Sequence, residues 1–509
     1  MHDCVHDLAT FVLGDFGFRV EDNNLHKLPS KTRHLSIVMD TIDYSEQHDS
    51  EQLNGISKAK CLRTFLPVNF DFSGHLFWVR LQNRLLMEEG CLRVLSLNKF
   101  QIAKLPDSIG NLKHLRYLDL SGTSIKEIPD TSCTLYNLET LLLKYCCKLT
   151  RLPTDIGCLI KLRHLDFSHS SIYELSLQIF DMKDLQTLKP SFILQKEHAD
   201  SSIKKLGAFQ QLHGRLGIWG LENVVDVKNV FEAKLRDKKF ITALDLRWVD
   251  GWADSDYSMK ERDPMKEREI LNRLQPHTSL KKLEIWGYSG TGFSDWMGDQ
   301  SFSSIVEVKL YRCYNCTSLW PLDQLPSLKT LLIGGSFRRV INWEFFSKGS
   351  SMTKPFRSLE SLCLENMREW REWLFREGEV VFPTLEKLEL RYCPHLEVRL
   401  LPDCFPSLAN LRVNFCKQVK LLPATHRGLI FPSLQELQIW NCPEQELILE
   451  GGLPSSLEII DIYGCGNLKA LDNNGFRLLT SLRQLKISYC KQFQGLPELP
   501  SYPFDLKIS

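Results

Sequence analysis

Leucines recur along this chain in the pattern L-x-x-L-x-L at a nearly constant interval. The clearest copies begin at Leu92, Leu115, Leu138 and Leu162, and their central leucines lie 23 or 24 residues apart. A unit repeated at such a period packs only on the units before and after it, so the core grows in one direction. The pattern therefore predicts a solenoid in which every unit contributes one short parallel strand.

The same register continues almost to both ends of the chain. The central apolar residues of the units are Leu35, Phe65, Leu95, Leu118, Leu141, Leu165, Leu188, Leu216, Leu244, Leu283, Val308, Leu331, Leu362, Leu388, Leu411, Leu437, Ile460 and Leu485. These eighteen units have a mean spacing of about 26 residues, which is typical of leucine-rich repeats. We therefore predict an α/β leucine-rich-repeat solenoid with one parallel sheet on its concave face and short helices or irregular turns on its convex face.

Charge and hydropathy exclude several classes of function. The 63 Lys and Arg residues almost balance the 62 Asp and Glu residues, so no net field attracts nucleic acid or an anionic membrane. No apolar run reaches the length of a transmembrane helix, and the N-terminus has acidic residues where a secretory signal would be basic. A single glycosylation acceptor begins at Asn315. These features favour a cytoplasmic protein.

Cysteines recur at one position of the repeat, three residues after the last apolar residue of the strand motif. The seven residues concerned are Cys146, Cys313, Cys393, Cys416, Cys442, Cys465 and Cys490. At this position a free cysteine turns inward and behaves as a small apolar residue. Disulfides and a zinc site are the alternatives, but the Cys313-x-x-Cys316 pair has no second ligand pair at a zinc-finger spacing. We expect a buried ladder of free thiols and no metal.

The repeat spacing divides the chain into three parts. Residues 1–30 begin with a short amphipathic segment and continue with a polar stretch. Residues 31–190 carry the regular repeats, and residues 191–509 carry repeats of uneven spacing. Two inserts fall in this last part, at residues 250–268 and 337–356. The first insert is densely charged, and we expect it to be a solvated loop.

Motifs for catalysis are absent from the sequence. It contains no GxxxxGK[ST] phosphate loop, no HExxH and no GxSxG motif. Accidental His–Asp pairs are inevitable in a chain of this composition and therefore carry no weight. We expect no catalytic residue and no enzymatic activity.

The outward positions of the predicted strands are the remaining candidates for function. Neighbouring residues of a strand point to opposite faces, so the residues that flank the inward leucines line the concave surface. Aromatic residues and arginine are enriched at protein-binding hot spots. The candidates for partner binding are Trp286, Tyr311, Arg391, Arg412, Asn414, Gln438, Trp440, Tyr463 and Lys486, and Asp461 and Ser488 are expected on the same face. Each one alone could equally be an ordinary solvated strand residue.

The first residues of the chain, Met1-His2-Asp3, resemble the MHD motif of plant intracellular nucleotide-binding leucine-rich-repeat disease-resistance proteins of the coiled-coil class. The segment from Leu212 to Val225 and the Phe382-Pro383-x-Leu repeats are similar to the repeat region of the same family. The resemblance covers essentially the whole chain. It implies that residues 1–30 are the winged-helix end of a nucleotide-binding module, followed by the repeats.

The resemblance also implies a function. In the family the histidine of this motif, here His2, senses the phosphate of bound ADP, and Asp3 supports the local fold. The phosphate loop of the relatives, which bind ADP or ATP, is not found in this sequence, so we expect a truncated receptor that binds no nucleotide cofactor. Its expected partners are a pathogen effector or a guarded host protein and, in relatives, the receptor's own nucleotide-binding domain.

Two other interpretations remain open at this point. One is a free-standing leucine-rich-repeat scaffold that binds a protein without any nucleotide switch. The other is an extracellular repeat receptor, which would need a signal peptide and many glycosylation acceptors.

Overall fold

The chain was analysed as a computed structural model. The structure describes residues 12–20, 27–38, 59–68, 91–172, 177–189, 191–248, 262–313, 315–316, 319–335, 356–368, 370–371, 380–400, 405–421, 431–445, 447–448, 454–471, 479–495 and 504–508. These residues form two compact units. The first comprises Met1–Ile218 and Glu232–Lys234, and the second comprises Trp219–Phe231 and Leu235–Ser509.

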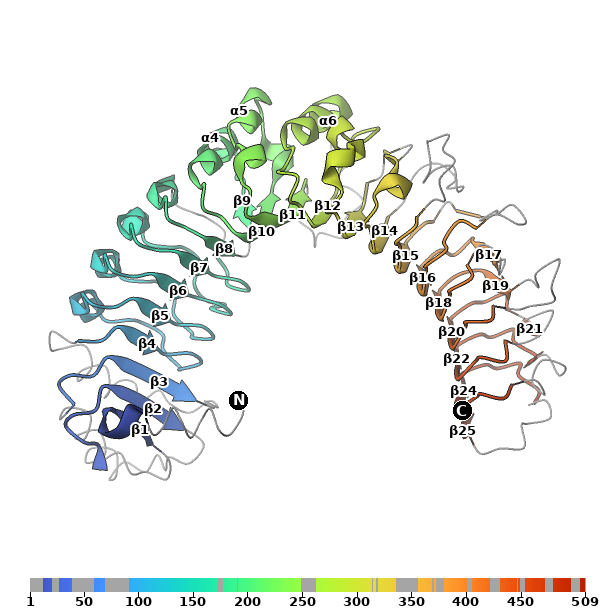
Figure 1. The fold of residues 1–509 in the computed structure, drawn as a ribbon, viewed down its shortest axis with the longest axis horizontal. Helices are drawn as coiled ribbons and strands as arrows, with labels where there is room; N and C mark the ends of the chain where they lie inside the picture. The colour runs from blue at the N-terminus through green and yellow to red at the C-terminus, as the bar shows by residue number, and fades with distance from the viewer. Residues whose placement is uncertain are drawn as a thin grey trace. The chain divides into compact units, whose positions relative to one another are not determined.

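The first unit contains a parallel sheet whose strands follow one another in chain order (Figure 1). These strands are β1 (Gly17–Val20), β2 (His34–Val38), β3 (Thr64–Val68), β4 (Val94–Ser96), β5 (Tyr117–Asp119), β6 (Thr140–Leu142), β7 (His164–Asp166) and β8 (Thr187–Lys189). The short strand β9 (Phe192–Ile193) follows, and β10 (Gly214–Trp219) ends at the first residue of the second unit.

Short helices form the opposite side of the regular repeats, as the sequence predicts. They are η4 (Asp107–Asn111), η5 (Asp130–Thr134), η6 (Thr154–Cys158) and η7 (Leu177–Asp181), and the later elements η8 (Leu206–Ala208) and α4 (Ala199–Lys205) belong to the same unit. A further turn, η1 (Gly14–Phe16), precedes β1. Prolines stand immediately before η4, η5 and η6, and Pro106 and Pro129 have extended backbone angles. A proline has no N–H to donate to a further ladder bond, so it marks the end of an extended segment.

The second unit contains a longer parallel sheet. The strands that this unit contributes to the sheet pair in chain order. They are β11 (Ile241–Arg247), β12 (Lys282–Trp286), β13 (Glu307–Tyr311), β14 (Thr330–Gly334), β15 (Ser361–Glu365), β16 (Lys387–Arg391), β18 (Asn410–Asn414), β20 (Glu436–Trp440), β22 (Ile459–Tyr463), β24 (Gln484–Ser488) and β25 (Asp505–Ile508).

Other elements of the second unit lie outside this sheet. They are η9 (Leu221–Asn223), α5 (Lys228–Phe231), η10 (Leu235–Asp237), α6 (Pro264–Arg273), η12 (Asp295–Gly298), η13 (Gln300–Phe302) and η14 (Leu322–Gln324). Two small parallel ladders were not predicted, and they pair β17 (Glu397–Leu400) with β19 (Gln418–Leu421) and β21 (Leu447–Ile448) with β23 (Ala470–Leu471).

The framework residues of the repeats form the core. All eighteen predicted central residues lie in strands, and none has more than 4% of its surface exposed. Equivalent residues pair laterally, as in Leu388 with Leu411 and Leu411 with Leu437. The predicted fold class, a leucine-rich-repeat solenoid, is therefore confirmed.

Cysteines and phenylalanines complete the interior of the later repeats. Cys393, Cys416, Cys442 and Cys465 are buried free thiols, as predicted, whereas Cys490 at the end of the series is half-buried. Their Sγ atoms donate to backbone carbonyls of the strand ends, for example from Cys442 to Trp440 at 3.5 Å. A hydrogen bond with Cys442, and after it burial, raise the pKa of Cys465 to about 12.

Glycine has a steric role in the regular repeats. A Cβ atom on Gly157 would come within 2.4 Å of the carbonyl oxygen of Gln178 in the next repeat. We expect Gly157→Ala to lower the free energy of unfolding by about 1–3 kcal/mol, because rigid backbone must move to relieve the contact. Gly466→Ala is the matched control, since a Cβ there meets nothing within 4 Å. Urea denaturation of both variants tests this expectation, and equal stabilities would contradict it.

Two local expectations need correction. The charged insert does not end as a solvated loop, because helix α6 begins at Pro264. Asp263 caps that helix by accepting from the backbone N–H of Met265 and Lys266, and proline is favoured at the first helical position. The polar stretch after Gly14 contains β1, whose Val20 is buried and pairs with Ile37 of β2.

Candidate functional site

The outward residues of the second sheet form two lateral rows. The first row contains Asp245, Glu284, Lys309, Leu332, Cys363, Glu389, Arg412, Gln438, Asp461 and Lys486. The second row contains the last residue of each strand, which is Arg247, Trp286, Tyr311, Gly334, Glu365, Arg391, Asn414, Trp440, Tyr463 or Ser488. All nine candidate residues from the sequence fall in these rows. The in-register pairing brings them to one face.

All nine candidates are at least partly accessible to solvent, as expected for residues on an outward strand face. Tyr463 is exposed, and the other eight candidates are half-buried. Ser488, which was also expected on this surface, is only 4% exposed, so that expectation is wrong. It lies opposite Tyr463 in the outward register, but its side chain is far shorter than the neighbouring ring.

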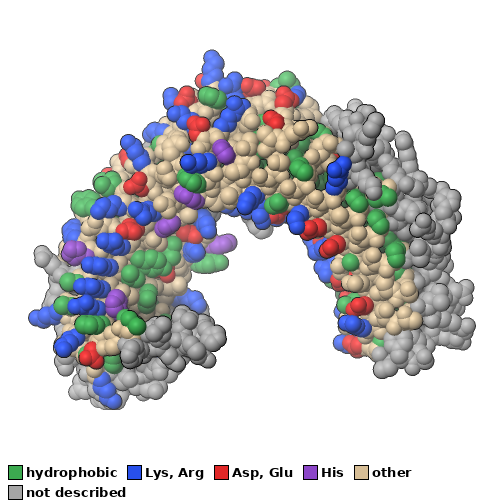
Figure 2. Space-filling view, viewed as in Figure 1, with side chains coloured by type: hydrophobic (Ala, Val, Ile, Leu, Met, Phe, Trp, Pro, Cys, Tyr) green, Lys and Arg blue, Asp and Glu red, His purple; other side chains and the backbone are tan. Residues whose placement is uncertain are grey.

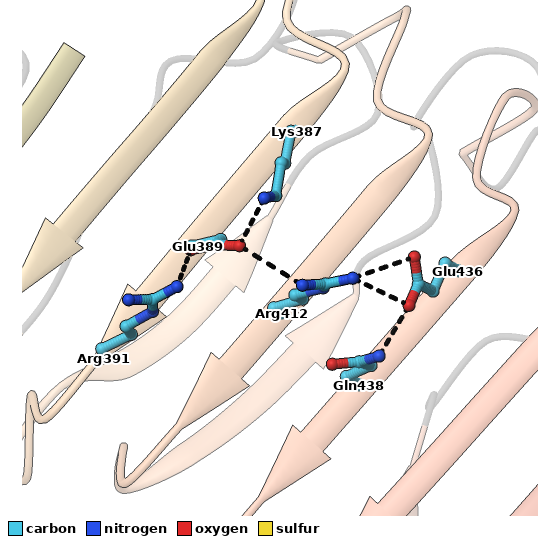
Figure 3. Close-up of polar contacts among 6 residues, drawn as sticks. All are labelled: Lys387, Glu389, Arg391, Arg412, Glu436 and Gln438. Carbon is cyan, nitrogen blue, oxygen red and sulfur yellow. Dashed lines mark hydrogen bonds and ion pairs between the residues drawn. The ribbon is translucent and has the colours of Figure 1, made fainter. Parts of the chain in front are cut away.

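A network of ion pairs connects strands β16, β18 and β20 (Figure 3). The carboxylate of Glu389, whose side chain is 6% exposed, pairs with Lys387 at 2.7 Å and with Arg391 and Arg412. Burial alone would raise the pKa of Glu389, but the hydrogen bond from Lys387 and the charges of the surrounding cations lower it. The carboxylate of Glu389 therefore stays ionised and pairs with three cationic side chains that are more exposed than it is.

Arg412 extends the network to the next strand. Its Nη2 lies 3.2 Å from Glu436 Oε1, which also accepts a hydrogen bond from Gln438 Nε2 at 2.6 Å (Figure 3). Its Nη1 lies 3.7 Å from Glu389, so one guanidinium bridges two carboxylates. Figure 2 shows Lys, Arg, Asp and Glu side chains interspersed along this strand face. The carboxylates of Glu389 and Glu436 together orient the planar guanidinium of Arg412.

An aromatic and cationic cluster occupies the other end of the same rows. The guanidinium of Arg247 lies 4.1 Å from the ring centroid of Trp219 and 4.8 Å from that of Trp286. The rings of Trp286 and Tyr311 stack with centroids 3.9 Å apart and an interplanar angle of 21°. Asp245 fixes Arg247 through a 3.0 Å ion pair. Such stacked aromatic and cationic groups are rigid contact surfaces.

Trp219 and Arg247 were not among the sequence candidates. Both are the last residues of strands, as Trp286 is, so the strand pattern could have identified them. The side-chain nitrogen of Trp286 donates to Glu284 at 2.6 Å, which links the two rows.

Several polar atoms of the rows have no hydrogen-bond partner although they are inaccessible. They are Arg412 Nε, Asn414 Oδ1, Trp440 Nε1 and Asp461 Oδ1, on three consecutive strands of the sheet. Buried polar groups without partners cost stability, and native structures contain only a few of them. Two of these atoms are donors and two are acceptors.

Similarity to known proteins agrees with this architecture. The family model described as R13L1/DRL21 leucine-rich repeats matches residues 203–336, and the general leucine-rich-repeat model matches residues 114–135. Disease resistance RPP13-like protein 1 of Arabidopsis thaliana is 36% identical over 524 aligned residues, which cover 100% of this chain and 49% of that protein. This chain belongs to the leucine-rich-repeat family of plant disease resistance proteins.

Further relatives of this resistance-protein chain carry similar names. A second disease resistance protein of Arabidopsis thaliana is 42% identical over 82% of the chain and 29% of its own length. Disease resistance protein RGA2 of Solanum bulbocastanum is 30% identical over 83% of the chain and 39% of its own length. The chain thus spans about half or less of the length of these relatives.

Met1-His2-Asp3, the residues that the sequence suggested as the MHD motif, lie outside the described residues. Residues 337–355 of the predicted insert at 337–356 also lie outside the described residues. Within the described parts of this resistance-protein chain, no group of three or more His, Cys, Asp and Glu side chains is arranged to hold a metal ion. Among those same parts, no helix is long and apolar enough to cross a membrane.

Proposed function

We propose that this chain is the recognition region of a cytoplasmic plant immune receptor. Its second sheet would bind a protein in defence, either a pathogen effector or a guarded host protein. Homology to disease resistance proteins supports the biological setting. The observation that carries the proposal is the in-register alignment of aromatic and arginine side chains in the two outward rows.

The chemistry of the rows supports protein binding and not catalysis. Three residues from consecutive strands, Asn414, Trp440 and Tyr463, form one continuous stretch of the second row. Tryptophan, tyrosine and arginine contribute most at protein interfaces, because they present large contact areas with little conformational freedom to lose. The neighbouring network holds Arg412 in a fixed orientation, so little entropy is lost when a partner contacts it.

Paired substitution of Arg412 and Trp440 tests the proposal. The tagged full chain and its Arg412→Ala/Trp440→Ala variant are expressed in leaf tissue, and the proteins that co-purify are quantified by mass spectrometry. We expect a specific protein that the original chain retains to be lost by about 30-fold, the effect of removing one hot spot of 2 kcal/mol.

The control is Phe231→Ala/Arg273→Ala, which removes the same kinds of side chain from helices α5 and α6. This control should retain the same protein. Equal retention by all three chains, or loss only in the control, would refute binding through the strand face. Calorimetric titration with ADP and ATP accompanies the test, and we expect no saturable heat from either nucleotide.

A further inference from the structure

The second row contains a break beside its aromatic cluster. The residues from β11 to β15 run in the order Arg247, Trp286, Tyr311, Gly334 and Glu365. Trp286 stacks on one face of the Tyr311 ring, on the side of β12. On the other side of that ring stands Gly334, which has no side chain to cover it.

The ring of Tyr311 leaves no room for a larger residue at position 334. A Cβ atom at this position would lie 3.1 Å from Cδ1 and 3.6 Å from Cε1 of Tyr311, and 3.8 Å from Cβ of Glu365. The first of these distances is tighter than ordinary van der Waals contact, so a side chain here would displace the ring. Glycine therefore leaves the ring face open toward β15.

The charge at the break is negative, and the only cation beside Glu365 in the second row, Arg391 on β16, is already paired with Glu389. Glu365 is half-buried, and its carboxylate has no hydrogen bond or ion pair with another described residue. The first-row neighbours on β14 and β15 are Leu332 and Cys363, which supply no cation. Lys309 on β13 is held by Glu307. Arg391, which adjoins Glu365 in the second row, pairs with Glu389 and also feels the charge of Glu365.

The pKa of Tyr311 also reflects the negative charges around the break. Burial, followed by the charges of Glu284 and Glu365, raises the pKa of Tyr311 to about 12. A hydroxyl surrounded by carboxylates remains protonated, and the electron-rich ring face keeps its attraction for positive charge. Geometry and electrostatics therefore favour the same kind of ligand.

We propose that the break at Gly334 is a subsite for a lysine or arginine side chain of the bound protein. The cation would lie over the open face of Tyr311 and pair with the carboxylate of Glu365. The inference rests on the proposed function, because it names one chemical requirement of that partner.

The chain already contains such an arrangement three strands away in the same row, at Arg247 on β11. Arg247 lies between the rings of Trp219 and Trp286 while Asp245 holds its guanidinium. Strands β13 and β15 lie about 10 Å apart, two strand spacings, so a planar cation above β14 can reach both a ring and a carboxylate. Arginine suits the site better than lysine, because its flat guanidinium can stack and pair at the same time.

Peptide pools provide the test without knowledge of the partner. The purified full chain is titrated with four pools of nine-residue peptides that have uncharged random flanks and a central arginine, lysine, glutamine or glutamate. We expect the arginine pool to bind at least about fivefold more strongly than the glutamine pool, a cation–π contact with an ion pair. The glutamate pool should bind most weakly.

Two substitutions locate the effect. Glu365→Gln removes the charge without changing the shape, and Gly334→Leu fills the break, so each should reduce the preference for arginine to less than about twofold. Glu458→Gln and Gly466→Leu are the matched controls. The first removes a carboxylate paired with Arg483 outside the rows, and the second adds a side chain where nothing lies within 4 Å.

The outcomes separate this inference from the proposed function. An original chain without preference for arginine, or a preference that survives both Glu365→Gln and Gly334→Leu, overturns the subsite. If Glu365→Gln also retains the co-purified protein that Arg412→Ala/Trp440→Ala loses, the strand face binds protein but the subsite is wrong. Thermal denaturation shows whether Gly334→Leu is folded, and Glu365→Gln decides the matter if it is not.

Discussion

Leu411→Asp is expected to destabilise the second unit by about 5 kcal/mol or more. Leu411 has 0% of its surface exposed and lies between Leu388 and Leu437 on the adjacent strands. The substitution removes apolar contacts and places a carboxylate where no described cation can reach it. Because each repeat packs on its neighbours, the disruption should spread along the array and not remain at one strand.

Asn410→Asp provides the comparison for this substitution. Asn410 precedes Leu411 on the same strand, but it is half-buried on the outward side. The same charge there should change the free energy of unfolding by less than about 0.5 kcal/mol. Chemical denaturation measures both variants, and hydrogen exchange shows which strands lose protection. A stable Leu411→Asp variant with native exchange would contradict the assignment of this residue to the core.

Arg262→Ala is expected to cost about 3–5 kcal/mol near neutral pH, because it leaves a buried carboxylate uncompensated. Arg262 donates to the carbonyl oxygen of Gly287 at 2.7 Å, and its Nε lies 3.4 Å from Oε1 of Glu267. The other oxygen of Glu267 accepts from the backbone N–H of Ser289 at 2.7 Å. These contacts tie helix α6 to the loop that follows β12.

The loss in this variant should depend on pH in a defined direction. Burial raises the pKa of Glu267 above its usual value even while Arg262 opposes the shift. Without Arg262 the pKa of Glu267 rises further, so the folded state prefers the protonated acid. The loss of unfolding free energy is then largest at pH values above the pKa of Glu267 in the folded state. It becomes smaller as the pH falls through that pKa toward the pKa of Glu267 in the unfolded state.

Urea denaturation from pH 8 down to pH 5 measures this dependence. The double variant Arg262→Ala/Glu267→Gln is the control, because glutamine can still accept from Ser289 but does not titrate in this range. Its deficit relative to the original chain should be independent of pH. A deficit in Arg262→Ala that grows on acidification would show that Glu267 is not the group responsible.

Much of the strand face could be predicted because its pattern is local. Alternation within five residues places Leu411 and Val413 inward and Arg412 and Asn414 outward, whatever lies elsewhere in the chain. The repeated cysteine position likewise predicted the buried thiol of Cys416. These positions repeat from unit to unit, so one error of register would have moved every one of them to the wrong face.

Helix α6 and β1 escaped prediction for the opposite reason. The sequence around the start of α6 has the composition of a charged insert. Only contacts with Gly287 and Ser289 bury Glu267 and hold Arg262 half-buried beside it. A helix of this length is marginal alone and depends on such tertiary contacts. Strand β1 is four residues long and is stabilised by pairing with β2.

The sequence by itself determined the repeat, the inward leucines and the outward residue types, because each follows from spacing within a single strand motif. Only the tertiary structure decided which outward residues are neighbours. Arg247 and Trp286 stand 39 positions apart in the chain, and Tyr311 and Gly334 stand 23 apart, yet each pair is adjacent in the sheet. The intervening loops differ in length, so lateral pairing, and with it the ion network and the break at Gly334, depends on how whole repeats pack.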